Sequence, residues 1–154
     1  MAELVIRKAT AEDVAQIEQI EKLCFATPWS YESLNHDIAN NPLAIYLVAE
    51  QAGEILGYVG TWMIYGESHI TNVAVSPNHR RQHVGSLLIE TLIQTMKNVD
   101  ITSHTLEVRE NNAAAQKLYA KYGFEAAGKR KGYYDDTGED AIIMWLGPRS
   151  DEQQ

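Results

Sequence analysis

In the first third of the chain, the spacing of apolar residues is first that of a strand and then that of a helix. Residues 4–7 alternate apolar and polar positions, which predicts a short strand. Residues 10–13 then fit a capping box, and the apolar residues that follow are spaced as on one face of a helix: Val14, Ile17, Ile20, Leu23 and Cys24. Ser30 is placed to cap a second, short helix over about residues 31–39, which ends at Asn40-Asn41-Pro42. The pattern therefore predicts one strand and two helices before residue 43.

Three β-rich segments come next, separated by short turns. They cover residues 43–50, 55–65 and 69–75, with turn residues at 51–54 and 66–67. Gly57 and Gly60 fall inside the second segment, where we expect them to allow bends. The three segments predict a meander of neighbouring strands.

Helices and strands alternate in the second half. A central helix is predicted over about residues 82–98, a strand over 102–108, a helix between Asn112 and Gly123, and two strands over 124–131 and 139–146. The predicted order is β-α-α-β-β-β-α-β-α-β-β. This is an α/β or α+β fold with a mixed, mostly antiparallel central sheet flanked by helices. We expect one domain over residues 1–148 and a polar C-terminal tail over residues 149–154.

The composition excludes some classes of protein but does not indicate a particular function. A chain of 154 residues, 45% hydrophobic and 22% charged, fits one soluble domain. No apolar run or leader pattern predicts a membrane span or signal peptide. The single cysteine, Cys24, is expected to be a small buried hydrophobe and suits a cytoplasmic protein. The formal net charge of −8 disfavours a nucleic-acid partner and is compatible with a basic one, although solubility alone also explains it.

The strongest chemical signal lies in residues 73–86, V-A-V-S-P-N-H-R-R-Q-H-V-G-S. An apolar strand breaks at Ser76-Pro77, two arginines follow, and a helix then begins. Backbone N–H groups at a helix N-terminus, with cations beside them, bind phosphate. The candidate anion-binding residues are Arg80, Arg81, Gln82, His83, Val84, Gly85 and Ser86.

Read together with a second motif, this stretch resembles the GNAT acetyltransferase superfamily. The superfamily's acyl-CoA motif, Q/R-x-x-G-x-G/A, falls on residues 80–85. Its later motif, N-x-x-A-x-x-L-Y-x-x-x-G-F, is matched without a mismatch by Asn112, Ala115, Leu118, Tyr119, Gly123 and Phe124. The resemblance implies acetyl-CoA as cosubstrate, with its pyrophosphate on residues 80–86. It also implies that the backbone of Val73, Ala74 and Val75 faces the thioester, and that Asn112 reaches the pantetheine arm.

His83 departs from this motif, because it stands where the superfamily has its first glycine. If the glycine serves only close backbone approach, a helical His83 can donate its N–H with its side chain turned outward. If the site requires a positive φ, His83 is strained. We expect the helical conformation, since the helix should already have begun at this residue.

A narrower resemblance is to the RimI-type bacterial N-terminal acetyltransferases, which modify the N-terminal alanine of small-subunit ribosomal protein eighteen. It rests on local strings at residues 28–30, 70–75, 106–109, 133–134 and 139–144. It implies that a protein or peptide α-amine attacks acetyl-CoA directly in a ternary complex, without an acyl-enzyme. We expect no direct nucleic-acid or membrane partner, and a monomer or weak dimer.

Two side chains are candidates for the proton transfers of such a reaction. Glu107 lies between Leu106 and Val108, so alternation places its carboxylate on the opposite face of the strand from them. It is either a solvated strand carboxylate or, as the RimI resemblance implies, a general base acting through a water. An α-amine, with a pKa of about 7.7–8.0, needs less help than a lysine at about 10.4. Tyr119 is either an aromatic core residue or the acid that protonates the departing CoA sulfur.

Four aromatic residues are expected to line the acceptor groove: Trp29, Tyr31, Tyr133 and Tyr134. Trp29 could instead brace the helix that starts at Ser30. The acidic residues between positions 135 and 140 form either a solvated turn or an attraction for a basic peptide.

The five histidines show no metal-ligand spacing, so no metal is expected. Two alternatives to an N-terminal protein acetyltransferase remain. One is a small-molecule amine (polyamine or antibiotic) acetyltransferase on the same scaffold. The other is a catalytically silent CoA-binding regulatory module, which the presence of both Glu107 and Tyr119 disfavours.

Overall fold

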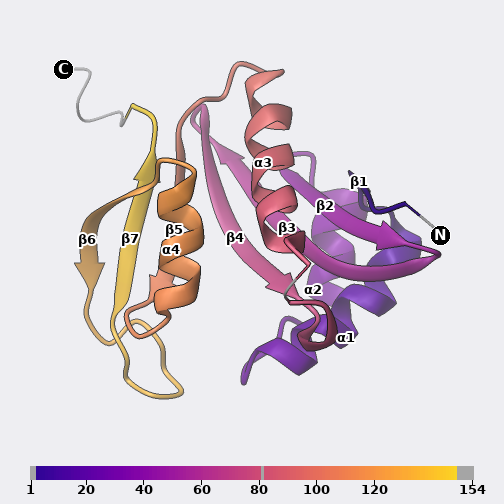
Figure 1. The fold of residues 1–154 in the computed structure, drawn as a ribbon, viewed down its shortest axis with the longest axis horizontal. Helices are drawn as coiled ribbons and strands as arrows, with labels where there is room; N and C mark the ends of the chain where they lie inside the picture. The colour runs from indigo at the N-terminus through magenta and orange to yellow at the C-terminus, as the bar shows by residue number, and fades with distance from the viewer. Residues whose placement is uncertain (1–2, 81, 149–154) are drawn as a thin grey trace.

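The computed structural model describes residues 3–80 and 82–148, which form one seven-stranded sheet with helices on both faces (Figure 1). The strands are β1 (Val5–Lys8), β2 (Ala44–Gln51), β3 (Glu54–Ile64), β4 (Glu67–Val75), β5 (His104–Arg109), β6 (Glu125–Arg130) and β7 (Ala141–Leu146). The α-helices are α1 (Val14–Cys24), α2 (Tyr31–Asn35), α3 (Val84–Lys97) and α4 (Ala113–Lys121). Short 3-10 segments cover Ala11–Asp13 and Pro77–His79, and a π-helical turn covers His36–Asn40.

The predicted order of strands and α-helices and the mixed, mostly antiparallel sheet are confirmed. Among the described residues the strands lie in the order β1-β2-β3-β4-β5-β7-β6, and the one parallel pair is β4 with β5. The predicted caps are also present: Ser30 Oγ accepts from Ser33 N at 3.1 Å, and Asn112 Oδ1 accepts from Ala115 N at 3.1 Å. The predicted polar tail lies outside the described residues.

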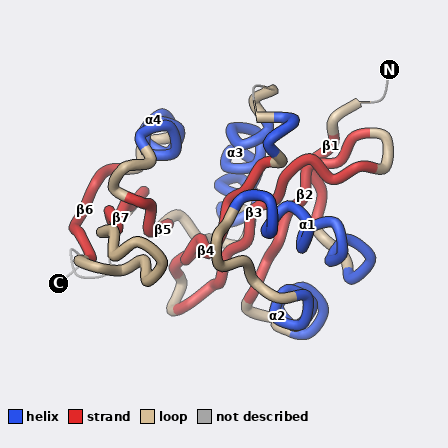
Figure 2. The backbone as a smooth tube through the Cα atoms, turned by 90° about the horizontal axis from the view of Figure 1, so that it is seen from below, coloured by secondary structure: helices blue, strands red, loops and turns tan. Residues whose placement is uncertain are grey.

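The helices divide between the two faces of the sheet. Figures 1 and 2 show α3 and α4 on one face and α1 and α2 on the other. Each pair covers its own apolar core. The larger core joins α3 and α4 to the sheet, and the smaller one lies under α1 and α2.

The sheet opens between β4 and β5. These strands pair only through Ser68 with His104 and His69 with Thr105, near their first residues. β5 then pairs with β7 along its whole length. The later residues of β4, up to Val75, therefore have no strand partner on the β5 side within the described chain. We call this opening the split.

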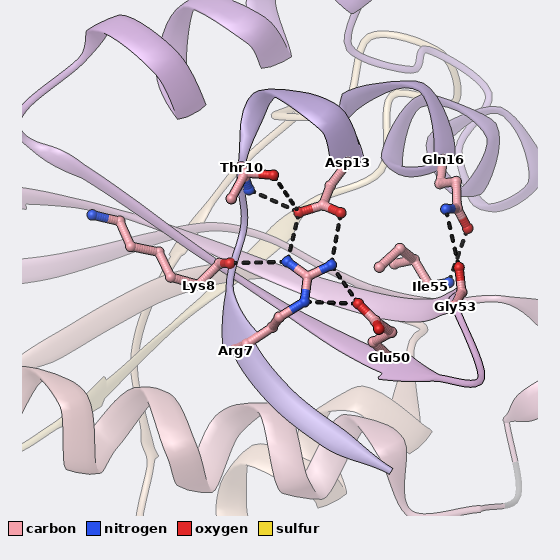
Figure 3. Close-up of polar contacts among 8 residues, drawn as sticks. All are labelled: Arg7, Lys8, Thr10, Asp13, Gln16, Glu50, Gly53 and Ile55. Atoms are coloured by element: carbon pink, nitrogen blue, oxygen red, sulfur yellow. Dashed lines mark hydrogen bonds and ion pairs between the residues drawn. The ribbon is translucent and has the colours of Figure 1, made fainter. Parts of the chain in front are cut away.

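A network of ion pairs around Arg7 holds β1 against the rest of the fold (Figure 3). The Arg7 guanidinium donates to both carboxylate oxygens of Asp13, each at 2.8 Å, and its Nε donates to Glu50 at 2.7 Å. Asp13 also accepts from Thr10 N at 2.7 Å, which completes the predicted capping box. The hydrogen bond from Arg7 lowers the pKa of Asp13. Nearby, Gln16 of α1 accepts from Ile55 N at 2.9 Å.

The two glycines of β3 serve close packing, and both also lie where the strand register shifts, as the expected bends require. A Cβ on Gly57 would lie 2.8 Å from the carbonyl oxygen of Ala74 and 3.2 Å from Val84. A Cβ on Gly60 would lie 2.6 Å from the ring of Tyr46. Gly57 therefore lets the start of α3 lie close to the end of β4.

Candidate active site

The last residues of β4 present backbone N–H groups to the split. Ser76 N–H donates to the Leu56 carbonyl at 2.8 Å, so it points toward β3. Successive N–H groups of a strand point to opposite sides. The N–H groups of Val75 and Val73 therefore point away from β3 and into the split, while that of Ala74 points toward β3. This is the arrangement needed to polarise a carbonyl held in the split.

The anion-binding stretch ends at the N-terminus of α3. Val84, Gly85 and Ser86 are its first residues, and the first N–H groups of a helix have no acceptor inside it. Gln82 lies in the turn before the helix, two residues ahead of where it begins. Arg81 lies outside the described residues. α3 therefore starts later than predicted, at Val84, and the phosphate site stays a prediction.

The expected helical conformation of His83 is wrong. Its φ is +60° and its ψ is +23°, which is left-handed, and it is the N-cap residue of α3. The chain must reverse between the Pro77–His79 segment and α3 within a few residues, and a positive φ makes that turn. Histidine is one of the non-glycine residues found more often in this region, which is why the turn is tolerated.

The Arg80 side chain folds back on the end of β4. Its Nε donates to the Val75 carbonyl at 3.3 Å, and its Nη2 lies 3.5 Å from Cys24 Sγ. Cys24 Sγ donates to the same carbonyl at 3.4 Å. Cys24 is half-buried, so the expectation of a buried thiol is only partly right. These contacts tie the C-terminus of α1 to the base of the phosphate loop.

Glu107 faces away from the larger core, as alternation predicted. Leu106 and Val108 are buried in the core beneath α3 and α4, whereas the Glu107 side chain is 29% exposed. The carboxylate therefore lies on the α1–α2 face of the sheet. Arg130 Nε lies 3.5 Å from Glu107 Oε1.

Tyr133 and Tyr134 lie near Glu107. Burial, and then the Glu107 charge, raise the pKa of Tyr133. Burial raises the pKa of Tyr134 to about 12, against the opposing effect of Arg109. The two rings meet edge to face with centroids 5.0 Å apart, and the Arg109 guanidinium lies 4.0 Å above the Tyr134 ring. These residues form a polar aromatic cluster beside Glu107.

Arg109 also organises the acidic turn between β6 and β7. It pairs with Asp136 at 2.9 Å and with Glu139 at 3.4 Å. Asp140 accepts from Gly132 N at 2.8 Å. The turn is thus held together by its acidic residues, and Arg109 offsets part of the charge that was considered as an attraction for a basic peptide.

Tyr119 lies on the opposite side of the sheet from Glu107. It is 7% exposed, belongs to the core beneath α3 and α4, and contacts the Phe124 ring at a centroid distance of 5.8 Å. Burial, and then the neighbouring Tyr134, raise the pKa of Tyr119, so the phenol keeps its proton at neutral pH. The ring is a core residue, and its hydroxyl is still a proton donor.

Gly85, at the start of α3, lies close to both α4 and the end of β4. A Cβ there would lie 3.4 Å from Leu118 of α4 and 3.7 Å from Val75 of β4. The start of α3, the end of β4 and the Tyr119-bearing helix therefore converge at the mouth of the split.

Trp29 and Tyr31 lie apart from Tyr133 and Tyr134. They lie beside α1, α2 and β3. The Trp29 ring packs against Trp62 with centroids 6.0 Å apart and ring planes at 57°. Tyr31 is the first residue of α2 and is exposed. The four predicted groove residues thus divide into two pairs, one from each side of the split.

Sequence reasoning missed two polar residues that hold the Trp29 loop. Glu21 of α1 is fully buried and accepts from Trp29 N at 2.9 Å and from Asn72 Nδ2 at 2.6 Å. Burial raises the pKa of Glu21. The signal was present, since Glu21 follows Ile17 by four residues on the apolar stripe of α1. Asn72 carries no comparable signal.

Residues 3–80 and 82–148 contain neither a metal-binding cluster nor a membrane-spanning helix. No group of three or more His, Cys, Asp or Glu side chains is arranged to hold a metal ion there. Every helix in the same residues is too short or too polar to cross a bilayer.

Several known proteins resemble this chain in both sequence and fold. Residues 14–124 match the Acetyltransferase (GNAT) family. A Bacillus subtilis protein, provisionally named a ribosomal protein bS18-alanine N-acetyltransferase, is 40% identical over 141 residues, which cover 92% of this chain and 93% of that protein. The Escherichia coli K12 ribosomal protein bS18-alanine N-acetyltransferase is 35% identical over 136 residues, covering 87% and 90%.

The structural comparison agrees. The crystal structure of the ribosomal-protein-S18-alanine N-acetyltransferase from Escherichia coli superposes with a TM-score of 0.86 at 32% identity, covering 94% of this chain and 93% of that one. The chain belongs to the GNAT family of N-acetyltransferases, and both the resemblance found in its motifs and the predicted class of enzyme are confirmed.

Proposed function

We propose that this protein is an acetyl-CoA-dependent N-terminal acetyltransferase whose acceptor is the N-terminal alanine of ribosomal protein bS18. The observation that carries the proposal is identity of 35–40%, over nearly the whole chain, to proteins named for that activity. The split supports it, because it offers a thioester side and an acceptor side on opposite faces of one sheet.

The thioester side is formed by β4, α3 and α4. The Val75 N–H, with Val73 two residues before it, polarises the acetyl carbonyl in the split. The N–H groups of Val84, Gly85 and Ser86 receive the pyrophosphate at the positive end of α3. Arg80, Arg81, Gln82 and the His83 backbone complete the phosphate loop. The Asn112 side chain, whose oxygen caps α4, offers its NH₂ group to the pantetheine arm.

The acceptor side is formed by Glu107 and the aromatic residues near the split. Glu107 takes a proton from the α-amine through a water, and the neutral amine attacks the acetyl carbon. The new C–N bond forms as the C–S bond breaks. Tyr119, on the CoA side, gives its proton to the departing sulfur. The acylated nitrogen then releases its extra proton to solvent, and the Tyr119 phenolate takes a proton back from solvent. The two proton carriers thus lie on the two faces from which the amine and the thioester arrive.

Kinetics with defined acceptors test the proposal. The peptides would carry the bS18 N-terminus with a free α-amine, the same sequence with a blocked α-amine, and a lysine-containing sequence with its α-amine blocked. A polyamine would represent small acceptors. We expect acetylation of the free α-amine only, located by mass spectrometry. Acetylation of lysine or polyamine with none at the α-amine would show that the acceptor is not a peptide α-amine and would overturn the proposal.

A further inference from the structure

A pocket separate from the split opens between α2 and β3. Its volume is about 390 Å³, within the usual range for small-ligand sites. Its lining residues come from the loop before α2, from α2 with the turn that follows it, and from β3: Trp29, Glu32, Ser33, His36, Asp37 and Trp62. The pocket lies on the α1–α2 face, which is also the face of Glu107.

The aromatic wall of this pocket is fixed by hydrogen bonds. Trp62 Nε1 donates to Asp37 Oδ2 at 2.8 Å, which holds the indole plane. The Trp29 ring packs on Trp62, and its backbone N–H is held by Glu21. Two large π surfaces are therefore preorganised at one site.

Among the described residues, the carboxylates that line the pocket have no cationic partner. Asp37 is 5% exposed, and it accepts from the neutral groups Tyr46 Oη at 2.9 Å, Trp62 Nε1, and Asn41 Nδ2 at 3.1 Å. Neutral donors satisfy the oxygens but leave the charge. In the described part of the chain neither Asp37 nor Glu32 forms an ion pair.

We propose that this pocket binds an arginine or lysine side chain of the acceptor peptide, downstream of its reacting amine. Indole faces attract cations, and the attraction is strengthened by nearby carboxylates in a partly desolvated site. The assignment rests on the proposed function, in that it requires a peptide acceptor. It adds a second point of recognition that a small amine cannot reach.

The fold also sets which peptide position can reach the pocket. Trp29 is tied through Glu21 to Asn72, three residues before Val75, and Trp62 pairs with His69, six residues before Val75. At about 3.3 Å per residue these offsets are about 10–20 Å along β4. An extended peptide covers that length in about three to six residues. The cation should therefore lie about three to six residues beyond the N-terminal alanine.

A positional scan tests this. Alanine-initiated peptides would each carry one arginine, or its neutral isostere citrulline, at one position from 2 to 8. At the matching position we expect citrulline to lower kcat/KM by about 2- to 30-fold, mainly through KM. In the Trp62→Leu and Glu32→Gln variants, the ratio of kcat/KM for the arginine peptide to kcat/KM for the citrulline peptide should fall toward one. Trp145→Leu and Glu125→Gln, a half-buried tryptophan and an exposed acid outside the pocket, should keep it.

The outcomes separate the two proposals. If no peptide is acetylated at its α-amine, the proposed function fails. If peptides are acetylated but arginine and citrulline are used equally at every position, the pocket assignment is overturned. It is also overturned if Glu32→Gln and Trp62→Leu both retain the wild-type ratio. Should Trp62→Leu unfold, Glu32→Gln decides alone, because Glu32 is an exposed residue of α2.

Discussion

His83 carries the tightest local constraint on the phosphate loop. Its left-handed backbone directs the chain into α3, and the N–H groups of the next three residues then face the proposed pyrophosphate position. A non-glycine residue costs about 1–2 kcal/mol in this conformation. The protein therefore loses stability at the residue where the GNAT acyl-CoA motif has its first glycine.

Replacing His83 with glycine should relieve that cost. Glycine removes the strain but adds about 0.5–1 kcal/mol of unfolded-chain entropy, so His83→Gly should stabilise the protein by about 0.5–1 kcal/mol. Affinity for acetyl-CoA should be kept or improved, because the backbone supplies the contact. Urea unfolding and acetyl-CoA titration measure the two effects. The backbone assignment is contradicted if His83→Gly and His83→Ala both lose acetyl-CoA binding, because both variants lack the imidazole.

At the scale of elements, α3 can lie against β4 only because position 57 has no side chain. Gly57 faces both the Ala74 carbonyl and Val84, the first residue of α3. Any Cβ there must move a strand carbonyl or the start of the helix. The same contact therefore serves the fold and the phosphate site.

Gly57→Ala should accordingly destabilise the protein by about 1–3 kcal/mol and weaken acetyl-CoA binding. Gly128→Ala on β6 is the matched control, since its Cβ would meet Ile143 at an ordinary 3.6 Å. Thermal unfolding and acetyl-CoA titration of both variants make the comparison. Equal effects in the two variants would show that the contact at Gly57 does not matter.

Caps and local periodicity allowed the elements to be predicted, but not the contacts between distant segments. Ser30 and Asn112 marked their helices because an N-cap acts within three residues. The position of Glu107 followed from strand alternation. The division of the aromatic residues into two pairs, and the bond from Asn72 to Glu21, depend on residues about 50 or more positions apart. Nothing local in the sequence encodes such pairs.

The His83 turn was missed for a related reason. A left-handed residue is decided by where the preceding 3-10 segment leaves the chain, not by the residue type alone. The pocket between α2 and β3 was likewise not foreseen, because Trp62 reads in the sequence as an ordinary strand residue.

At the scale of the whole molecule, stability depends on a buried histidine at the point where β4 and β5 join. His104 pairs with Ser68, is fully buried, and neither ring nitrogen has a hydrogen-bond partner among the described residues. Burial lowers the pKa of His104 from 6.5 to about 4. The folded protein therefore resists protonation that the unfolded chain accepts.

Acid should consequently weaken the fold in a defined window. Above pH 6.5 both states hold neutral His104, and stability is complete. As the pH falls from 6.5 toward 4 only the unfolded state takes up the proton, so this residue removes up to about 3 kcal/mol. Urea unfolding of wild type and His104→Leu at several pH values isolates the contribution. A loss of stability between pH 6.5 and 4 that is the same in both proteins would contradict it.

We propose that Glu107 and Tyr119 carry protons on opposite faces of the split during acetyl transfer. The most direct measurement is kcat for an alanine-initiated peptide, alongside the acetyl-CoA Kd, in Glu107→Gln and Tyr119→Phe. Glu110→Gln is the control, since Glu110 is an exposed acid in the adjoining turn and pairs with Lys129. We predict that each active-site variant loses about 10²–10⁴-fold in kcat with Kd nearly unchanged, and that Glu110→Gln stays near wild type. A Glu107→Gln enzyme with wild-type kcat would contradict the role of Glu107 as general base.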